Sequence, residues 1–246
     1  MKICRFQSGT NTFTGAIDGD SVSVVENNSP SDQTYKLSDV QLIPPVTPSK
    51  IVCVGRNYAE HAAEMGNEVP KEPLLFLKAP SALIGSEDVI KLPRQSEQVE
   101  HEGELAVIIG RRCKNLYDDD EPLSYVFGFS CLNDVTARDL QKKDGQFTRA
   151  KSFDTFCPVG PFIETDFNLE NAGVTTRVNG AIKQKAKFSQ MVFPVDFLIR
   201  YISNMMTLLP GDVIATGTPS GVSKLQTGDV CEVEIDGIGI LRNPVQ

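Results

Sequence analysis

Short apolar runs that end at glycine, proline or a polar residue recur along the central part of the chain. Runs of this length, rich in β-branched residues, are typical of buried strands, because a buried helix needs a longer stretch. We therefore predict strands at 51–55, within 71–80, at 105–109 and at 126–132. The pattern predicts a mainly β core.

Three turn signals divide other strand-like stretches into hairpins. An Asp-Gly pair lies inside residues 15–25, Asn179-Gly180 separates 174–178 from 181–185, and a second Asp-Gly pair lies inside 230–240. Both dipeptides favour the positive φ angles that two-residue hairpin turns require. We expect a β-hairpin at each of these places.

Two stretches carry helical signals. After Pro194, the apolar residues at 195, 198, 199, 202 and 205–206 keep helical spacing, which indicates core packing rather than a cofactor site. Residues 57–66 predict a shorter helix that Asn57 caps, with Glu60 as its reciprocal partner, and that Gly66 ends. A helix of about two turns is unstable alone, so tertiary contacts or a ligand must hold it.

A proline-rich linker divides the chain. Residues 1–45 look like a small N-terminal β unit with a polar loop at 27–32, and residues 44–49 contain three prolines. We expect the larger catalytic domain at 46–246, and the fold class to be α+β, predominantly β.

Composition excludes several classes of protein. The net charge of −8 argues against a nucleic-acid or anionic-membrane partner. No apolar run approaches the roughly 18 residues that span a bilayer, and the first residues lack the apolar core of a secretory signal. The six cysteines contain no CxxC pair, so we expect reduced thiols in a cytoplasmic protein. Two histidines argue against a multi-histidine zinc or iron site and leave a carboxylate-dominated metal site open.

Glu102 and Glu104 form the strongest candidate site. They lie two residues apart at the start of the strand at 105–109, so they share a face if the strand extends back to Glu102. Neighbouring buried carboxylates stay ionised together only beside positive charge, and a hard divalent cation suits them. Asp134, at the end of the strand at 126–132, is a plausible third oxygen ligand. An exposed strand end with two solvated glutamates is the simpler alternative.

Other candidate residues are weaker individually. His61 and Glu64 share one helix face, which suits a general base held by a carboxylate, although a surface ion pair has the same spacing. Lys78 and Lys151 lie near strand ends and either bind an anionic substrate or face solvent. The loop Gly217-Thr218-Pro219-Ser220-Gly221 offers backbone N–H groups and hydroxyls to a carboxylate, and lacks the lysine of a phosphate-binding loop.

Five segments in this order resemble the fumarylacetoacetate hydrolase (FAH) superfamily. The resemblance spans about 50–245 and is closest to small FAH-domain acylpyruvate hydrolases and oxaloacetate decarboxylases. It implies a mixed β-sandwich roll with few helices, and a homodimer. The segments are Ile51–His61, Glu102–Leu105, Asn133–Asp139, Lys151–Asp154 and Thr216–Pro219.

The resemblance also implies roles for individual residues. Glu102, Glu104 and Asp134 match ligands of Mg²⁺ or Mn²⁺, and His61 and Glu64 match a catalytic pair on a lid helix. Lys151, a further catalytic candidate, matches a polar group around the substrate. The remaining candidates for substrate binding are Arg56, Lys78, Arg138, Gln141, Gly217 and Thr218. Val135 departs from the family pattern, which often has tryptophan there, and we expect it to alter the pocket wall.

The function implied first is metal-dependent hydrolysis of a C–C bond in a small 2,4-dioxo acid, an acylpyruvate. His61 would activate water, and the metal and Lys151 would stabilise the pyruvate enolate. Oxaloacetate decarboxylation, or isomerisation or tautomerisation of a 2-hydroxy-diene-dioate, would use the same residues. A non-catalytic binding protein on this fold would not need the His61–Glu64 pair.

Overall fold

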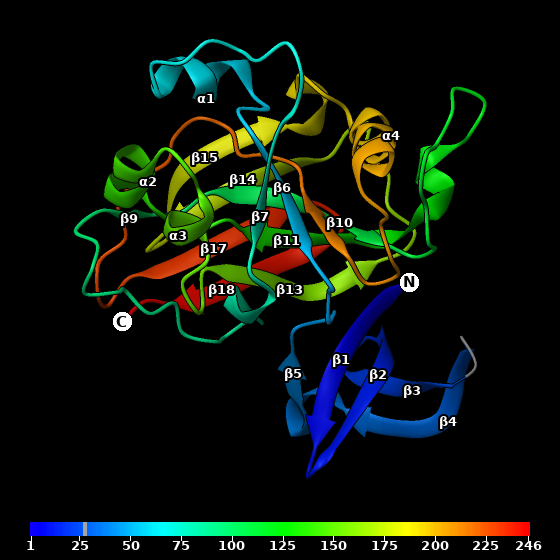
Figure 1. Cartoon of the computed structure of the whole chain (residues 1–246). Helices are drawn as coiled ribbons and strands as arrows, with labels where there is room; N and C mark the ends of the chain where they lie inside the picture. The colour runs from blue at the N-terminus through cyan, green and yellow to red at the C-terminus, as the bar shows by residue number, and fades with distance from the viewer. Residues whose placement is uncertain (27–28) are drawn as a thin grey trace.

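The predicted apolar runs form strands in the computed structural model of the chain, which describes residues 1–26 and 29–246 (Figure 1). The strands are β1 (Lys2–Ser8), β2 (Asn11–Asp18), β3 (Ser21–Glu26), β4 (Ser29–Lys36), β5 (Gln41–Ile43), β6 (Ile51–Gly55), β7 (Leu74–Lys78), β8 (Leu83–Ile84), β9 (Val99–Glu100), β10 (Gly103–Ile109), β11 (Val126–Asn133), β12 (Thr136–Ala137), β13 (Cys157–Glu164), β14 (Gly173–Val178), β15 (Ala181–Lys187), β16 (Val213–Ala215), β17 (Val230–Ile235) and β18 (Gly239–Pro244). The α-helices are α1 (Ala59–Glu64), α2 (Arg138–Asp144), α3 (Thr148–Lys151) and α4 (Val195–Met205), and short 3-10 helices lie at Leu37–Asp39, Pro80–Ala82, Pro122–Tyr125 and Phe188–Gln190.

A large mixed sheet and a smaller antiparallel sheet make up most of the protein. The large sheet has the order β4-β3-β2-β1-β13-β11-β10-β16-β6-β7, with β5 on β1 and β8 on β13, and the smaller sheet has the order β15-β14-β17-β18. Strand β16 pairs with β6 in parallel and with β10 in antiparallel orientation. The predicted α+β, predominantly β fold class is confirmed.

Strand β10 is buried along its whole length because both of its faces are covered. Leu105, Val107 and Ile109 pack with residues of the smaller sheet and α4, whereas Ala106 and Ile108 pack in a second cluster on the other face. This double burial explains why the run is apolar throughout rather than alternating. Glu104 continues the face of Ala106 and Ile108.

Gly103 lets the two sheets approach each other at the start of β10. A Cβ atom at this position would lie 2.0 Å from Thr176 Oγ1 of β14 and 3.4 Å from a methyl group of Val233. Only glycine fits at such a close approach. The space beside Gly103 is therefore taken by the smaller sheet and not by a ligand.

The N-terminal strands form a unit of their own that continues the large sheet (Figure 1). Phe6 packs on Phe13 and Tyr35, with ring centroids 5.4 Å apart in both pairs. Lys2 and Ile3 of β1 pair with β13, which joins the unit to the rest of the sheet. The loop predicted at 27–32 is wrong from Ser29 onward, where β4 begins, because pairing with β3 overrides the polar composition. Residues 27–28 lie outside the described residues.

The predicted hairpins and the longer helix are confirmed. Asn179 and Gly180 have φ angles of 52° and 77° and join β14 to β15. Pro194 is the N-cap of α4, which buries Val195, Leu198, Ile199 and Ile202 as its spacing predicts. No helix in residues 1–26 and 29–246 is long and apolar enough to cross a membrane.

The short helix α1 begins later than predicted and is not capped by Asn57. Its N-cap is Tyr58, which makes no side-chain cap hydrogen bond. Instead, the Asn57 amide is buried, donates to the carbonyl oxygens of Thr216 and Phe193 at 2.7 and 3.0 Å, and accepts from the Phe193 N–H. Gly66 ends the helix at a φ of 68°, as predicted, and the Gly66 and Asn67 N–H groups donate to the last helical carbonyls.

The buried carboxylate of Asp212 ties the linker to the large sheet at the start of β16. It accepts from the N–H and hydroxyl of Ser49, from the N–H groups of Lys50 and Leu209, and from the Lys50 ammonium. Burial opposes ionisation, but the hydrogen bonds from Lys50, Ser49 and Leu209 outweigh it and lower the pKa of Asp212. The ionised group therefore stabilises the fold.

We predict that Asp212→Asn lowers the free energy of unfolding in urea by about 2 kcal/mol at pH 7. Because the pKa is lower in the folded state, the wild-type advantage is complete above about pH 4 and declines as the pH falls further. Asp118→Asn, on an exposed loop, is the control and should change little. Equal stability of wild type and Asp212→Asn at pH 7 would contradict this role.

Candidate active site

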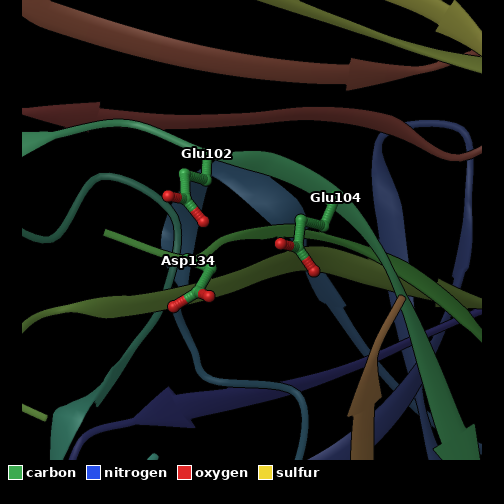
Figure 2. A group of neighbouring side chains, drawn as sticks. All are labelled: Glu102, Glu104 and Asp134. Atoms are coloured by element: carbon green, nitrogen blue, oxygen red, sulfur yellow. The ribbon is translucent and has the colours of Figure 1, made fainter. Parts of the chain in front are cut away.

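Three acidic side chains converge where β10 begins and β11 ends (Figure 2). Glu102 precedes β10, Glu104 belongs to it, and Asp134 follows β11, which pairs with β10 through Gly103 and Asn133. All three residues are at least 95% buried, and one oxygen of each lies within 4.8 Å of the others. The antiparallel register thus places carboxylates that are 30 residues apart in the sequence around one point.

Two of these carboxylates are paired with buried cations. The Lys151 ammonium donates to Glu102 Oε2 at 2.7 Å and to Asp134 Oδ2 at 2.6 Å, and Lys78 donates to the other oxygen of Asp134. Burial raises the pKa of a carboxyl, but Lys151 and Arg138 outweigh it and hold the pKa of Glu102 well below its usual range. Burial likewise disfavours the Lys151 ammonium, but Asp134 and Glu102 raise the pKa of Lys151 above its ordinary value.

Glu104 differs because no basic side chain in residues 1–26 and 29–246 forms a salt bridge with it. Its Oε2 accepts only the backbone N–H of Gly217, at 2.7 Å. Burial, Asp134 and Glu102 raise the pKa of Glu104 well above its usual range. A buried carboxylate that lacks a cation, beside two further carboxylate oxygens, fits a hard divalent cation. The triad can therefore hold such an ion.

Arg138 fixes Glu102 rather than standing free for a ligand. Its guanidinium donates to Glu100 Oε2 at 2.7 Å, to Gln141 Oε1 at 2.5 Å and to Glu102. Arg138 and Gln141 lie three residues apart on α2, which brings their side chains together. Because three donor groups of Arg138 are engaged by protein, its main effect is to orient Glu102 and Gln141.

A cavity of about 260 Å³ opens onto the triad. Phe76, Phe147, Met65 and Val54 supply apolar wall, and four basic side chains line the cavity beside the three acidic ones. The residues predicted from the sequence that line it are Arg56, His61, Glu102, Glu104, Asp134, Arg138, Gln141, Lys151 and Thr218, and Lys142 adds a further cation. Cations around a small cavity suit an anionic ligand.

The histidine of the cavity is held by its helix neighbour. His61 is 6% exposed, and its Nδ1 lies 3.1 Å from Glu64 Oε2. Helix α1, at the top of Figure 1, carries both residues. The other oxygen of Glu64 accepts the Gly221 N–H at 2.9 Å, so the backbone holds Glu64 although it lies at the surface, whereas His61 is buried.

Three predicted residues lie outside the cavity lining. Glu64 contacts His61, which lines the cavity, and the Gly217 N–H donates to Glu104, which also lines it. Lys78 is 1% exposed and lies behind Asp134, which corrects the expectation that it contacts substrate or faces solvent. Val135 is also buried in the core and does not line the cavity, so its departure from the family pattern does not reshape the described wall.

The sequence predictions missed Glu100 and Asn57. Glu100 anchors Arg138, and the alternation that pairs Glu102 with Glu104 extends back to it, so the signal was present. Asn57 holds the carbonyl of Thr216, directly before the loop that reaches Glu104. A polar residue before a short helix is ordinarily a cap, and nothing local distinguishes it from a long-range clamp.

This geometry defines a mainly β protein with a buried acidic triad that could hold a divalent cation. Residues 50–246 match the family described as Fumarylacetoacetate (FAA) hydrolase C-terminal, and residues 1–45 match one described as Rv2993c-like, N-terminal. The chain belongs to the fumarylacetoacetate hydrolase family.

Relatives and solved structures resemble this chain over most of its length. It is 54% identical over 211 residues to an uncharacterized protein of Methanocaldococcus jannaschii, covering 86% of this chain and 89% of the relative. It is 43% identical over 226 residues to oxaloacetate tautomerase YisK of Bacillus subtilis, covering 86% and 75%. The structure of 5-carboxymethyl-2-hydroxymuconate delta-isomerase from Mycobacterium smegmatis matches with a TM-score of 0.92 and 41% identity, covering 100% and 98%.

We predict that Mn²⁺ raises the thermal midpoint of the wild-type protein, and that Glu104→Gln weakens Mn²⁺ binding at least about tenfold. The substitution removes the charge that has no protein partner and keeps the shape of the side chain. Calorimetric titration measures the affinity, and Glu97→Gln, an exposed residue, is the control. Unchanged affinity in Glu104→Gln would remove this residue from the metal site.

Proposed function

We propose that the chain interconverts the keto and enol forms of a small 2-oxo dicarboxylate such as oxaloacetate. The main support is that His61 and Lys151 line the same cavity as the carboxylate triad, with His61 held by Glu64. Enolisation needs a group that takes a proton from carbon and positive charge beside the developing enolate oxygen. The name oxaloacetate tautomerase of the Bacillus subtilis relative supports the same reaction here.

We assign Glu102, Glu104 and Asp134 to a Mg²⁺ or Mn²⁺ ion, which when bound supplies a Lewis acid that polarises the 2-oxo group. His61 removes the proton from the adjacent carbon, and Glu64 keeps the imidazole in one orientation. An ammonium has three N–H donors, of which Lys151 gives two to Glu102 and Asp134. The third N–H of Lys151 stabilises the negative oxygen of the enolate. The proton that His61 removed from carbon then passes to that oxygen and completes the enol.

The cationic side of the cavity suits the second carboxylate of the substrate. Arg56 and Lys142 line it, and neither has a salt-bridge partner among the described residues. Arg56 adopts a φ of 58°, a conformation that costs a non-glycine residue energy and is concentrated at functional sites. We assign Arg56 and Lys142 to this carboxylate and Arg138 to the positioning of Glu102.

Hydrolysis of an acylpyruvate is the second candidate. The hydrogen bond between His61 and Glu64 favours it, because an imidazole held by a carboxylate can take a proton from water as well as from carbon. Oxaloacetate decarboxylation would release the same pyruvate enolate as this hydrolysis, by loss of CO₂ instead of attack of water. Tautomerisation instead forms the enolate of oxaloacetate itself, by loss of a proton from carbon. All three reactions need positive charge beside an enolate oxygen.

Parallel assays separate the candidates. Wild-type protein is incubated with enol-oxaloacetate and with acetylpyruvate, with Mg²⁺ or with EDTA, while enol absorbance, CO₂ and acetate are followed. EDTA-sensitive loss of the enol without CO₂ supports the tautomerase. EDTA-sensitive acetate formation supports the hydrolase, and CO₂ release in step with loss of oxaloacetate supports the decarboxylase.

We predict that His61→Ala lowers the enzymatic tautomerisation rate at least about a hundredfold, because general acid–base catalysis contributes about that much. Binding of Mn²⁺ should stay within about threefold of wild type, since His61 is not one of the proposed metal ligands. Glu68→Gln, an exposed residue after α1, is the control. A wild-type rate in His61→Ala would overturn the role of His61.

A further inference from the structure

The loop at 216–223, between β16 and β17, connects the catalytic helix to the metal-binding strand. On the helix side, the Gly221 N–H donates to Glu64 Oε1 at 2.9 Å and the Ser220 hydroxyl donates to Glu60 Oε2 at 3.3 Å. Glu64 holds His61 with its other oxygen. The orientation of His61 therefore depends on where this loop lies.

The same loop is bonded along the start of β10. The Thr216 N–H donates to the Leu105 carbonyl at 3.1 Å, and the Gly217 N–H donates to Glu104 Oε2 at 2.7 Å. The Thr218 hydroxyl donates to the Gly103 carbonyl at 3.0 Å. Since the single hydroxyl proton of Thr218 is used in this way, Thr218 serves the loop before it serves a ligand.

One buried side chain outside the cavity, Gln184 of β15, fixes the loop in this position. It is 1% exposed, and its Nε2 donates to Thr218 Oγ1 and to the Pro219 carbonyl, each at 2.7 Å. Its Oε1 accepts the Gly103 N–H at 3.0 Å and lies 3.1 Å from His101 Nδ1. The Gly103 N–H can only donate, which settles the orientation of the amide. All four hydrogen-bonding positions of Gln184 are thus used.

Gly221 shows independently that the loop rests directly on β15. Its φ is +100°, and a Cβ atom there would lie 2.0 Å from the Lys183 carbonyl oxygen and 3.3 Å from Gln184 Cγ. Any larger residue would push the loop away from the strand. The loop is therefore held by packing at Gly221 as well as by the amide of Gln184.

We propose that Gln184 is a positioning residue for the reaction, acting by fixing the 216–223 loop between Glu64 and β10. It sets the location of His61 relative to the triad without touching the substrate, since it does not line the cavity. This inference rests on the proposed function, in which His61 transfers the proton. A small displacement of a catalytic group lowers the rate steeply.

Gln184→Glu is the first test. It keeps the length of the side chain and an acceptor for Gly103, but turns an oxygen toward the Pro219 carbonyl and so releases the loop. We expect kcat for enol-oxaloacetate to fall at least about tenfold, with KM and Mn²⁺ affinity changed less than about threefold. Gln190→Glu, exposed after β15, places the same charge nearby and should have little effect.

Gly221→Ala tests the same loop without adding a charge, and serves if Gln184→Glu does not fold. We expect the same loss of kcat. Gly228→Ala is its matched control, because Gly228 also has a positive φ, +91°, but a Cβ atom there meets no atom within 4 Å. Equal kcat in Gly221→Ala and Gly228→Ala would contradict the role of the loop.

Combination with His61→Ala distinguishes positioning from a general structural effect. If Gln184 acts through His61, Gln184→Glu lowers the rate of the wild type but adds no further loss in the His61→Ala background. An equal loss in both backgrounds would overturn the proposal.

A measurement without turnover separates this inference from the proposed function. Hydrogen exchange of the α1 amides is followed in the complex with Mn²⁺ and oxalate, and we expect faster exchange in Gln184→Glu and Gly221→Ala than in wild type. Faster exchange with no tautomerase activity in the wild type would reject the proposed reaction and keep the role of Gln184. Unchanged exchange together with unchanged kcat in both variants would reject the role of Gln184.

Discussion

Burying several negative charges at one point is the constraint on which the rest of this structure depends. Four carboxylates, those of Glu100, Glu102, Glu104 and Asp134, meet three cationic side chains in a region that water hardly reaches. An uncompensated buried charge is costly, so each cation must be delivered accurately. Lys78 comes from β7, Arg138 from α2 and Lys151 from α3. The ion pairs thereby fix where these three elements lie against β10.

Glu104 is the carboxyl of the triad that no basic side chain of the described residues pairs with. Glu104 has a backbone N–H as its partner, while its neighbours have ammonium or guanidinium groups. A site with every charge matched would have little affinity for a further cation. Here Glu104 has no cationic partner in the described part of the chain, and it lines the cavity together with Arg56, Lys142 and Lys151. The carboxyl that lacks a cationic partner therefore lies at the cavity.

Helix α1 shows how a weak element can carry a buried side chain that lines the cavity. With six residues it is too short to be stable alone, so its position is decided by contacts to the 216–223 loop and by the turn at Gly66. A short helix held by few contacts opens at lower free energy than strands buried on both faces.

The sequence by itself determined the elements whose signals are local. The apolar runs at β6, β10 and β11, the Asn179-Gly180 turn and the spacing of α4 follow from burial and backbone preferences within a few residues. The alternation of Glu102 and Glu104, together with Asp134 at a strand end, was enough to name the three acidic residues that the fold brings together. The order of five motifs was enough to indicate the family.

Only the tertiary structure decided what each polar side chain contacts. The local sequence predicts a helix cap at Asn57, which instead binds the carbonyl of Thr216. It predicts a strand end at Lys78, whose ammonium lies behind Asp134. It predicts a loop at Ser29, where β4 begins. A hydrogen bond or ion pair depends on partners tens to hundreds of residues away, and the local sequence carries no record of them. Gln184 is the clearest case, because β15 is a mostly exposed strand in which nothing distinguishes the one buried amide that joins the 216–223 loop to β10.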